Sequence, residues 1–483
     1  PNYLYINDGT GAYLESAQNY GVDDVGCGLA IATTDINNDG IMDIYIANDF
    51  GEWIVPNTAY INNFPNKNFT NVSLPMNLNV GVYGMGIAVG DIDNDLDNDF
   101  YITNLGRNVL LKNNSLDGYQ DVSSISNVEN DFNNQGQRLT SWGALFLDMD
   151  NDSDLDLFVS NGYVPAAPFL NVALSDPNKF FINDGDGVFT DISSDNQESS
   201  EFFNRGAIYG DYDNDGDLDI FTVSVDGRVN SSSHSLFYTN QLSNSKNWIE
   251  ILLEGEEINR DALGSKVTVY SDQGIFMREN YGGGTFGSQN SKILHFGLNN
   301  SSSIEKVVVR WSHNNTQIFT NLPLNQRIYL KENNNNFKIV GCMDTSNPYY
   351  NKLATYNMGC FVESKFGCTD LDAINYNPNA IYDDGDCMYN VTVSNEADSE
   401  LSDNIFAYPN TFNNELFVSF LELDKHYDIC IYDMKGDVIY TIESNGKKSI
   451  RIDTSDYRSG VYILRINSQE NAKPSRIIKL IKN

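Results

Sequence analysis

The 483-residue chain has few of the side chains that enzymes use for proton transfer, and few cations. None of its four histidines lies at metal-ligand spacing from another, and none stands beside Ser or Cys in a nucleophile motif. The 30 Lys and Arg are outnumbered by 66 Asp and Glu, which gives a formal net charge of −36. Nucleic acid is therefore not an expected partner, because binding it requires a cationic face. We expect no enzymatic activity and an affinity for divalent cations.

Long hydrophobic runs are also missing from the chain. No stretch approaches the roughly 18 apolar residues of a membrane span, so we expect no transmembrane segment. Proline (12) and Trp (4) are scarce, whereas Tyr (28) and Phe (26) are common. With many Asn and Gly, this composition favours short strands joined by tight turns and predicts an all-β protein. The chain begins at Pro1 inside a strand-like segment, without Met or a signal peptide, and we interpret it as missing its true N-terminus.

An acidic nine-residue motif recurs four times, at spacings of 56, 57 and 63 residues. The copies are DINNDGIMD from Asp35, DIDNDLDND from Asp91, DMDNDSDLD from Asp148 and DYDNDGDLD from Asp211. Apolar segments flank each copy, so each is predicted to form the loop of a β-hairpin. A second hairpin recurs between the copies. Four strands per repeat of nearly 60 residues are typical of β-propeller blades.

The acidic loops place oxygen ligands at positions 1, 3, 5 and 9, with a backbone carbonyl at position 7. This spacing suits a hard cation such as Ca²⁺, and carboxylates so close together would repel one another without a metal. The predicted ligands are Asp35, Asn37, Asp39 and Asp43; Asp91, Asp93, Asp95 and Asp99; Asp148, Asp150, Asp152 and Asp156; and Asp211, Asp213, Asp215 and Asp219.

Position 6 of the loops separates them into two pairs. Gly40 and Gly216 supply a permissive φ there, whereas Leu96 and Ser153 predict weaker binding in the second and third loops. Two alternatives to a calcium loop fit the sequence less well. Acidic surface turns without a metal become less plausible with four copies in register. An EF-hand would need a Glu at position 12 and flanking helices, which the sequence lacks.

These repeats resemble the FG-GAP or VCBS-type repeat of integrin α-subunit propellers and many secreted bacterial proteins. The resemblance covers residues 1–245. It implies an integrin-α-like propeller of seven blades, of which this chain would hold four blades and a leading half-blade. Calcium is then expected to be structural, holding the hairpins of the blades in place.

A second β-rich domain is predicted for residues 246–333, where the repeat ends and segments such as NWIEILLEG, KILHFGL and KVVVRWS begin. These segments, an NRDALG turn and a GGGTFGSQN loop resemble the ASPIC/UnbV domain. A propeller followed by this domain resembles the cartilage acidic protein family, which implies an extracellular, acidic, calcium-binding protein. Arg260, Ser288 and Gln289 are candidates for a polar ligand site, although ordinary hairpin chemistry explains them equally well.

Four of the six cysteines lie in two degenerate copies of one motif within residues 340–390. Pairing within each copy would form the disulfides Cys342–Cys360 and Cys368–Cys387, each worth roughly 3 kcal/mol in the chain-entropy model. Free thiols or a Cys₄ zinc site are weaker alternatives, because no CxxC spacing is present. Disulfides imply an oxidising compartment. The second copy resembles a linker repeat of secreted bacterial proteins.

A last β-rich module is predicted for residues 404–483, after a polar linker at 391–403. It resembles the C-terminal sorting domain of the type IX (Por) secretion system. The matching residues are Tyr408-Pro409-Asn410, Gly436, Ser459-Gly460-Val461-Tyr462 and Lys479. The resemblance implies a small β-sandwich, a Gram-negative host, recognition by the type IX secretion machinery, and a secreted or outer-membrane-attached protein.

From these features we expect a surface protein that binds an extracellular glycan or matrix protein. Residues 52–57 and 162–176 are predicted loops of the propeller, and loops on a repeat scaffold commonly carry binding residues. The candidates for sugar contacts in them are Trp53, Tyr163, Phe169 and Asn171, with ordinary loop packing as the alternative. Two other functions stay open: a calcium-dependent polysaccharide lyase and a purely structural surface protein.

Overall fold

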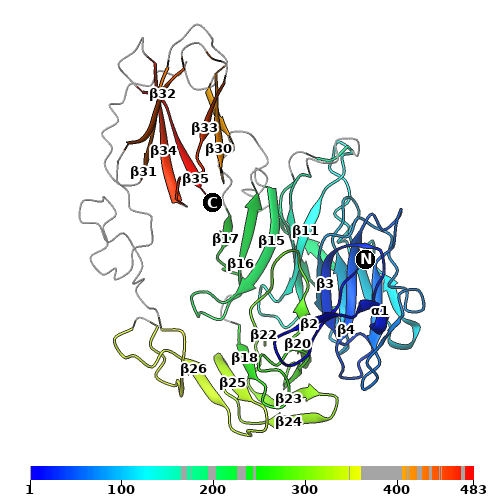
Figure 1. Ribbon diagram of the computed structural model, residues 1–483. Helices are drawn as coiled ribbons and strands as arrows, with labels where there is room; N and C mark the ends of the chain where they lie inside the picture. Colours follow the sequence, from blue (N-terminus) through cyan, green and yellow to red (C-terminus); the bar gives the residue numbers. More distant parts are fainter. Residues whose placement is uncertain are drawn as a thin grey trace. The chain divides into compact units, whose positions relative to one another are not determined.

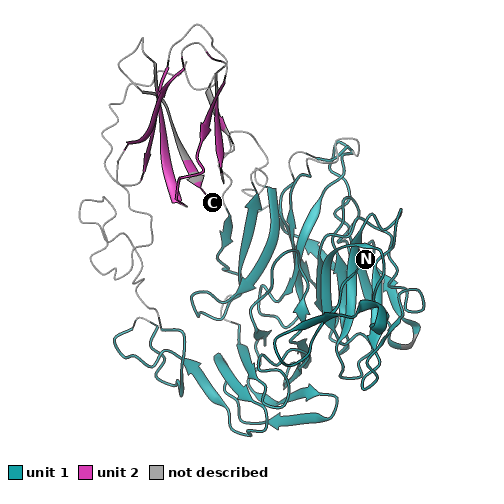
Figure 2. Cartoon of the chain, viewed as in Figure 1, with its two compact units in different colours: residues 1–362 teal, residues 363–483 magenta. Residues whose placement is uncertain are grey.

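The computed structural model divides the chain into two compact units, residues 1–362 and 363–483 (Figure 2). In the first unit it describes residues 2–164, 171–173, 176–193, 203–225, 235–242, 246–347 and 349–360. In the second it describes residues 405–408, 411–412, 414–420, 427–433, 438–444, 447, 449–458, 460–468 and 474–482. Regular structure in the described residues is almost entirely β, apart from the short helix α1 (Ala17–Tyr20) and one 3-10 turn, Ser115–Asp117. The all-β prediction is confirmed.

The first unit opens with the hairpin β1 (Tyr5–Asn7) and β2 (Tyr13–Glu15), followed by four successive antiparallel sheets (Figure 1). The first sheet contains β3 (Cys27–Thr34), β4 (Asp43–Asp49), β5 (Thr58–Asn62) and β6 (Phe69–Asn71). The second contains β7 (Ile87–Gly90), β8 (Asp99–Ile102), β9 (Val109–Asn113) and β10 (Tyr119–Asp121). The third contains β11 (Ser141–Leu147), β12 (Asp156–Asn161), β13 (Lys179–Asn183) and β14 (Phe189–Asp191). The fourth contains β15 (Phe203–Gly210), β16 (Asp219–Val225) and β17 (Leu236–Tyr238). These sheets are the predicted blades, and each acidic motif joins the first strand of a blade to its second.

The blades pack against one another through the side chains of both sheet faces, because successive residues of a strand point to opposite sides. Between the first and second blades, the rings of Tyr45 and Phe100 lie 4.8 Å apart. A second apolar cluster joins the second blade to the third through Tyr101 and Phe146. A third cluster joins the third blade to the fourth and includes Phe158. The repeat therefore builds its core between blades.

The second domain of this unit consists of two sheets around one core (Figure 1). One sheet is ordered β22 (Ile293–Gly297), β18 (Trp248–Glu254), β25 (Gln326–Lys331), β26 (Lys338–Gly341) and β27 (Tyr356–Asn357). The other is ordered β20 (Ile275–Glu279), β19 (Lys266–Ser271), β23 (Ile304–Ser312) and β24 (Asn315–Phe319). Trp311 and Phe296, both at most 1% exposed, are among the largest side chains of the core between them.

A glycine-rich segment of the second domain, residues 282–290, extends across the inner strands of several blades. Its strand β21 (Gly282–Gly283) pairs with β3 in the first blade. The Thr285 N–H donates to Ile87 O in the second blade at 2.5 Å, and Ser288 Oγ donates to Ala207 O in the fourth at 2.9 Å. Ser288, a candidate ligand residue, is thus engaged in a contact between domains.

The glycines that begin the inner strands make room for this segment. A Cβ atom added at Gly86 would lie 2.3 Å from the Trp142 carbonyl oxygen and 3.0 Å from that of Thr285. One added at Gly206 would lie 2.9 Å from the Phe286 carbonyl oxygen. In the second and fourth blades, the glycine five residues before the acidic motif therefore permits close approach of the backbones.

The second unit, described by itself, is a β-sandwich, as predicted. One sheet is ordered β28 (Ile405–Tyr408), β30 (Glu415–Phe420) and β33 (Ser449–Asp453). The other is ordered β29 (Thr411–Phe412), β35 (Pro474–Lys482), β34 (Gly460–Ser468), β31 (Tyr427–Asp433) and β32 (Val438–Glu443). The predicted Cys342–Cys360 disulfide is present in the first unit. The predicted Cys368–Cys387 pair and the 391–403 linker lie outside the described residues.

Candidate metal centres and the domain interface

The four acidic loops share one hydrogen-bond pattern, which explains why Asp occupies their first and last positions. In the second loop, Asp91 accepts the backbone N–H groups of Asp95 and Leu96 at 3.0 and 3.1 Å. Asp99 accepts the N–H groups of Ile92 and Asn113 at 3.0 and 2.8 Å. The equivalent bonds recur in the other three loops. These two carboxylates therefore close the hairpin and attach it to the next strand.

Position 6 of each loop adopts a left-handed conformation whether or not it is glycine. Gly40 and Gly216 have φ values of 88° and 93°, and Leu96 and Ser153 have φ values of 74° and 92°. A side chain in this region costs free energy, so the surrounding hydrogen bonds must hold the loop in place. Weaker metal binding by the second and third loops stays a prediction.

Three of the loops bring carboxylates close enough to share a cation. Within each cluster, one oxygen of every member lies within 4.8 Å of the others. The clusters are Asp91, Asp93 and Asp99; Asp148, Asp150 and Asp152; and Asp211, Asp213 and Asp215. The predicted ligands Asp95, Asp156 and Asp219 stand outside these groups, and the first loop forms no such group within the described residues.

Oxygen atoms without donors show that the second and third loops fit a cation. Asp93 Oδ1, Asp97 Oδ1 and Ser153 Oγ are buried and have no hydrogen-bond partner. A bound Ca²⁺ would satisfy such oxygens, and the donor set consists of the hard oxygen ligands that this ion prefers. Lys112 contacts Asp93, and Lys246 Nζ lies 3.2 Å from Asp150 Oδ2, but both lysines are partly exposed and can turn away into solvent.

The electrostatics of the clusters also favour a counter-ion. Burial, followed by repulsion from neighbouring carboxylates, raises the pKa of Asp97 to about 6 and that of Asp152 to about 7. Burial is also the largest cause of the raised pKa of Asp215, which reaches about 6. Without a metal, these groups therefore lose their protons only as the pH rises to about 6 to 7.

The first aspartate of each loop faces a group of the second domain. Asp35 contacts two cations, with Arg310 Nη2 at 2.5 Å and Lys266 Nζ at 3.2 Å from its Oδ2 atom. Asp211 Oδ2 lies 3.4 Å from Arg327 Nη2. Asp148 Oδ2 accepts the Gly297 N–H at 3.1 Å.

Asp91, the first aspartate of the second loop, interacts electrostatically with Arg278 of the second domain. Burial raises its pKa to about 7, and the positive charge of Arg278 opposes that rise. The acidic loops thus form the surface on which the second domain sits. The sequence did not lead us to predict the Lys and Arg residues of the second domain that face these aspartates. Their position on otherwise apolar strands, in a very acidic chain, is the pattern that could have indicated them.

The first loop differs from the others in its charge balance. The Asp35 side chain is 1% exposed, and two protein cations already contact it. Lys266 Nζ also donates to Asn38 Oδ1 at 2.7 Å. At position 3 an amide replaces the acid, and Asn37 Nδ2 donates to Asp39 Oδ2 at 2.9 Å. Calcium binding by this loop stays a prediction.

The residues predicted to contact sugars have different surroundings. Trp53 is 75% exposed, and its Nε1 donates to Tyr83 Oη at 3.2 Å. The backbone carbonyl of Tyr163 accepts from Arg205 Nη2 at 2.8 Å, and Asn171 Nδ2 donates to Gly136 O at 3.2 Å. Phe169 lies outside the described residues. Among those of these residues that the structure describes, Trp53 presents a large exposed ring to a ligand.

Comparison with known families agrees with this architecture. The FG-GAP-like repeat matches residues 35–102 and 148–222, and the ASPIC and UnbV domain matches residues 255–337. The secretion system C-terminal sorting domain matches residues 406–481. The chain therefore carries FG-GAP-like repeats, an ASPIC and UnbV domain, and a sorting domain for secretion and cell-surface attachment by the type IX machinery. No helix in the part of the chain that the structure describes is long and apolar enough to cross a membrane.

Among characterised proteins, the chain is similar to cartilage acidic protein 1. The mouse protein is 24% identical over 315 residues, which cover 63% of this chain and 37% of that protein. The human protein is also 24% identical, with 36% of its length covered. The chain therefore spans just over a third of the length of these relatives. A lectin from Agrocybe aegerita that recognises non-reducing terminal N-acetylglucosamine aligns over 46% of this chain and 54% of its own, at 14% identity and a TM-score of 0.28.

Proposed function

We propose that this protein is a calcium-stabilised binding protein of the bacterial surface, without catalytic activity, whose propeller engages an extracellular glycan or matrix protein. The observation that carries the calcium part is the convergence of carboxylates in three loops, with buried oxygens that lack donors. Carboxylates that ligate a cation stay ionised and cannot act as acids near neutral pH, which argues against their use in catalysis.

Calcium would act by stabilising the interface between the blades and the second domain. The same loops that gather carboxylates also contact Gly297, Arg327 and the other groups of that domain. At a dissociation constant of roughly 0.1 mM and about 1 mM calcium, each site adds about 1.4 kcal/mol to the free energy of unfolding. The combined stabilisation from several sites would be comparable to the net free energy of unfolding of a domain.

The ligand part of the proposal is supported by export to the cell surface and by exposed side chains in a propeller loop. The test is an array of glycans and matrix proteins, probed with the protein in calcium and in EGTA. Trp53→Ala should abolish binding, whereas Tyr13→Ala removes a ring that is 66% exposed in the N-terminal hairpin and should not. Binding that survives Trp53→Ala would contradict the propeller site. Turnover of a polysaccharide would instead favour a lyase.

A further inference from the structure

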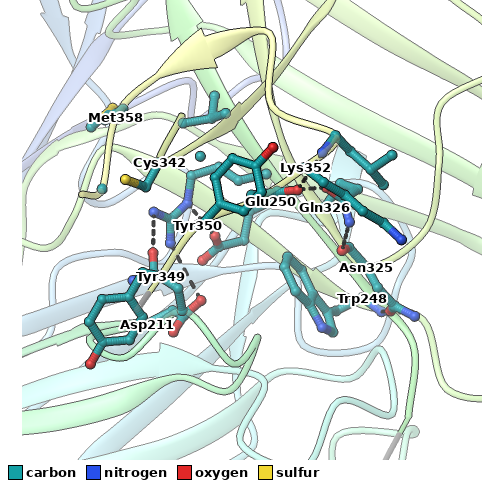
Figure 3. A pocket seen from close by; sticks show the side chains of 17 residues that line it. Asp211, Trp248, Glu250, Asn325, Gln326, Cys342, Tyr349, Tyr350, Lys352 and Met358 are labelled. Carbon is teal, nitrogen blue, oxygen red and sulfur yellow. Dashed lines mark hydrogen bonds and ion pairs between the residues drawn. The ribbon is translucent and has the colours of Figure 1, made fainter. Parts of the chain in front are cut away.

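A pocket of about 560 Å³ lies where three separate parts of the first unit meet, a volume typical of small-molecule sites. Asp211 and Asn214 come from the fourth acidic loop. Trp248 is the first residue of β18 in the second domain, and Asn325 directly precedes β25. The last part is the segment 342–360, which the Cys342–Cys360 disulfide closes. Figure 3 shows side chains from all three parts around one space. This segment lies beyond the ASPIC and UnbV match, which ends at residue 337.

The base of the pocket is polar and carries charges of both signs. Arg327 Nε lies 2.5 Å from Glu250 Oε2, and the two side chains are 12% and 2% exposed. The same guanidinium donates to Asn214 Oδ1 at 3.0 Å and lies 3.4 Å from Asp211 Oδ2. The guanidinium of Arg327 therefore pairs with the carboxylates of both Asp211 and Glu250. An apolar ligand would remove water from these polar groups without replacing its hydrogen bonds, which costs free energy. A hydroxylated ligand can replace those hydrogen bonds.

Amide side chains form one wall. Asn351 Nδ2 donates to Gln326 Oε1 at 3.1 Å, and Asn325 Oδ1 accepts the Trp248 N–H at 3.0 Å. These bonds fix the orientation of the amides and leave each group with further donor or acceptor capacity. Amides that offer both kinds of group suit hydroxyls, which also donate and accept.

Exposed apolar rings and side chains form the rim. Tyr350 is 44% exposed and Tyr349 is 39% exposed, and Leu353 and Met358 beside them are 48% and 41% exposed. All four belong to the disulfide-closed segment, whose closure limits their freedom before a ligand arrives. Aromatic side chains of this kind present an apolar face and a polar edge to a ligand, which suits the C–H faces and hydroxyls of a sugar.

We propose that this pocket binds an uncharged oligosaccharide. The amide wall and the polar base match hydroxyl groups, and the tyrosine rim matches the C–H faces of sugar rings. A polyanionic glycan is disfavoured, because a chain with a formal net charge of −36 repels it at long range. The pocket shares its ligand class with the proposed function but uses residues other than the propeller loops, so the two sites can fail separately.

The experiment applies the full chain, in calcium, to an array that contains uncharged, N-acetylated and sulfated glycans. Wild type should bind uncharged members. Tyr350→Ala should weaken this binding by about tenfold, whereas Tyr350→Phe, which keeps the ring, and Tyr13→Ala should each change it less than about twofold. Melting curves confirm that the variants fold, which is expected because both tyrosines are exposed.

The outcomes separate the pocket from the propeller site. Glycan binding lost in Tyr350→Ala and retained in Trp53→Ala supports the pocket. Binding lost in Trp53→Ala and retained in Tyr350→Ala overturns the pocket and leaves the propeller proposal standing. Binding to sulfated glycans alone, or to no glycan at all, also overturns the pocket.

Discussion

The aspartates of the acidic loops have two separate tasks. Asp91 and Asp99 accept backbone N–H groups and close the hairpin, whereas Asp93 at position 3 has a buried oxygen without a donor. The first group is needed for the turn in any state of the protein. We propose that Asp93 ligates a cation together with Asp91 and Asp99, so changes at the two kinds of position should have different effects.

Asp93→Asn tests the cation at the second loop, because it removes one charge at nearly constant shape. We expect the stabilisation by 1 mM calcium to fall by about 1 kcal/mol, since ligand charge sets the affinity of such sites. Urea denaturation with calcium and with EGTA measures this difference. Asp23→Asn, at an exposed position outside the acidic motifs, is the matched control and should leave the calcium effect unchanged. Equal calcium effects in both variants would contradict the assignment.

Lys266 tests the interface between the domains. Its side chain is 6% exposed and faces Asp35 and Glu279, both 1% exposed. Lys266→Met leaves these carboxylates with one cation fewer, and we expect the free energy of unfolding to fall by about 3 kcal/mol. Lys292→Met removes a pair with Asp261 that is largely solvated and should cost less than about 1 kcal/mol. Urea denaturation measures the free energy of unfolding of both variants. Similar losses in the two would contradict a larger contribution from the buried Lys266.

At the scale of the elements, the inner strand of each blade and the glycine-rich segment of the second domain depend on each other. Gly86→Ala places a methyl group 2.3 Å from the Trp142 carbonyl oxygen, so backbone must move. We expect a loss of about 2 kcal/mol, as for other overpacked interiors. At Gly210, also in an inner strand, the nearest atom to a new Cβ lies 3.9 Å away, and Gly210→Ala should be nearly neutral. Thermal melting compares the two, and an equal effect would contradict the packing argument.

For the whole molecule, removal of calcium should destabilise the first unit in a pH-dependent way. In the metal-free protein, the pKa values of Asp97, Asp152 and Asp215 are raised from 3.8 to about 6 to 7. Protonation of these carboxyl groups therefore stabilises the folded state, and this contribution is fully present below a pH near 3.8. That contribution is lost as pH rises through 6 to 7, where the carboxylates ionise and repel one another. Calcium binds the ionised form. The drop in melting temperature caused by EGTA should therefore be larger at pH 7.5 than at pH 5.5, and an equal drop would be inconsistent with calcium at these loops.

The two-unit organisation predicts that the sorting domain is an export address separate from the binding unit. The last 80 or so residues fold around a core of their own, with Leu464 and Ile452 fully buried in it. We expect the mature surface protein to end before residue 404. Mass spectrometry of the protein released from cells measures its C-terminus, and a chain that ends near residue 483 would refute this expectation.

The sequence by itself determined the features that depend on neighbours along the chain. Composition predicted an all-β protein, the period of the acidic motif predicted hairpins and blades, and the two cysteine motifs predicted Cys342–Cys360. Turn chemistry and loop closure act over short stretches, so spacing alone reveals them. Ligand spacing likewise predicted that carboxylates gather in each loop, and within the described residues three of the four loops form such a cluster.

The tertiary structure decided which of those carboxylates meet and what else they touch. Asp95, Asp156 and Asp219 fit the ligand spacing but stand outside the clusters. Arg310 lies 275 residues from its partner Asp35, and Tyr350 shares a pocket with Asp211. Contacts of this kind depend on how two sheets face each other across the fold, and no local pattern of residues encodes that geometry.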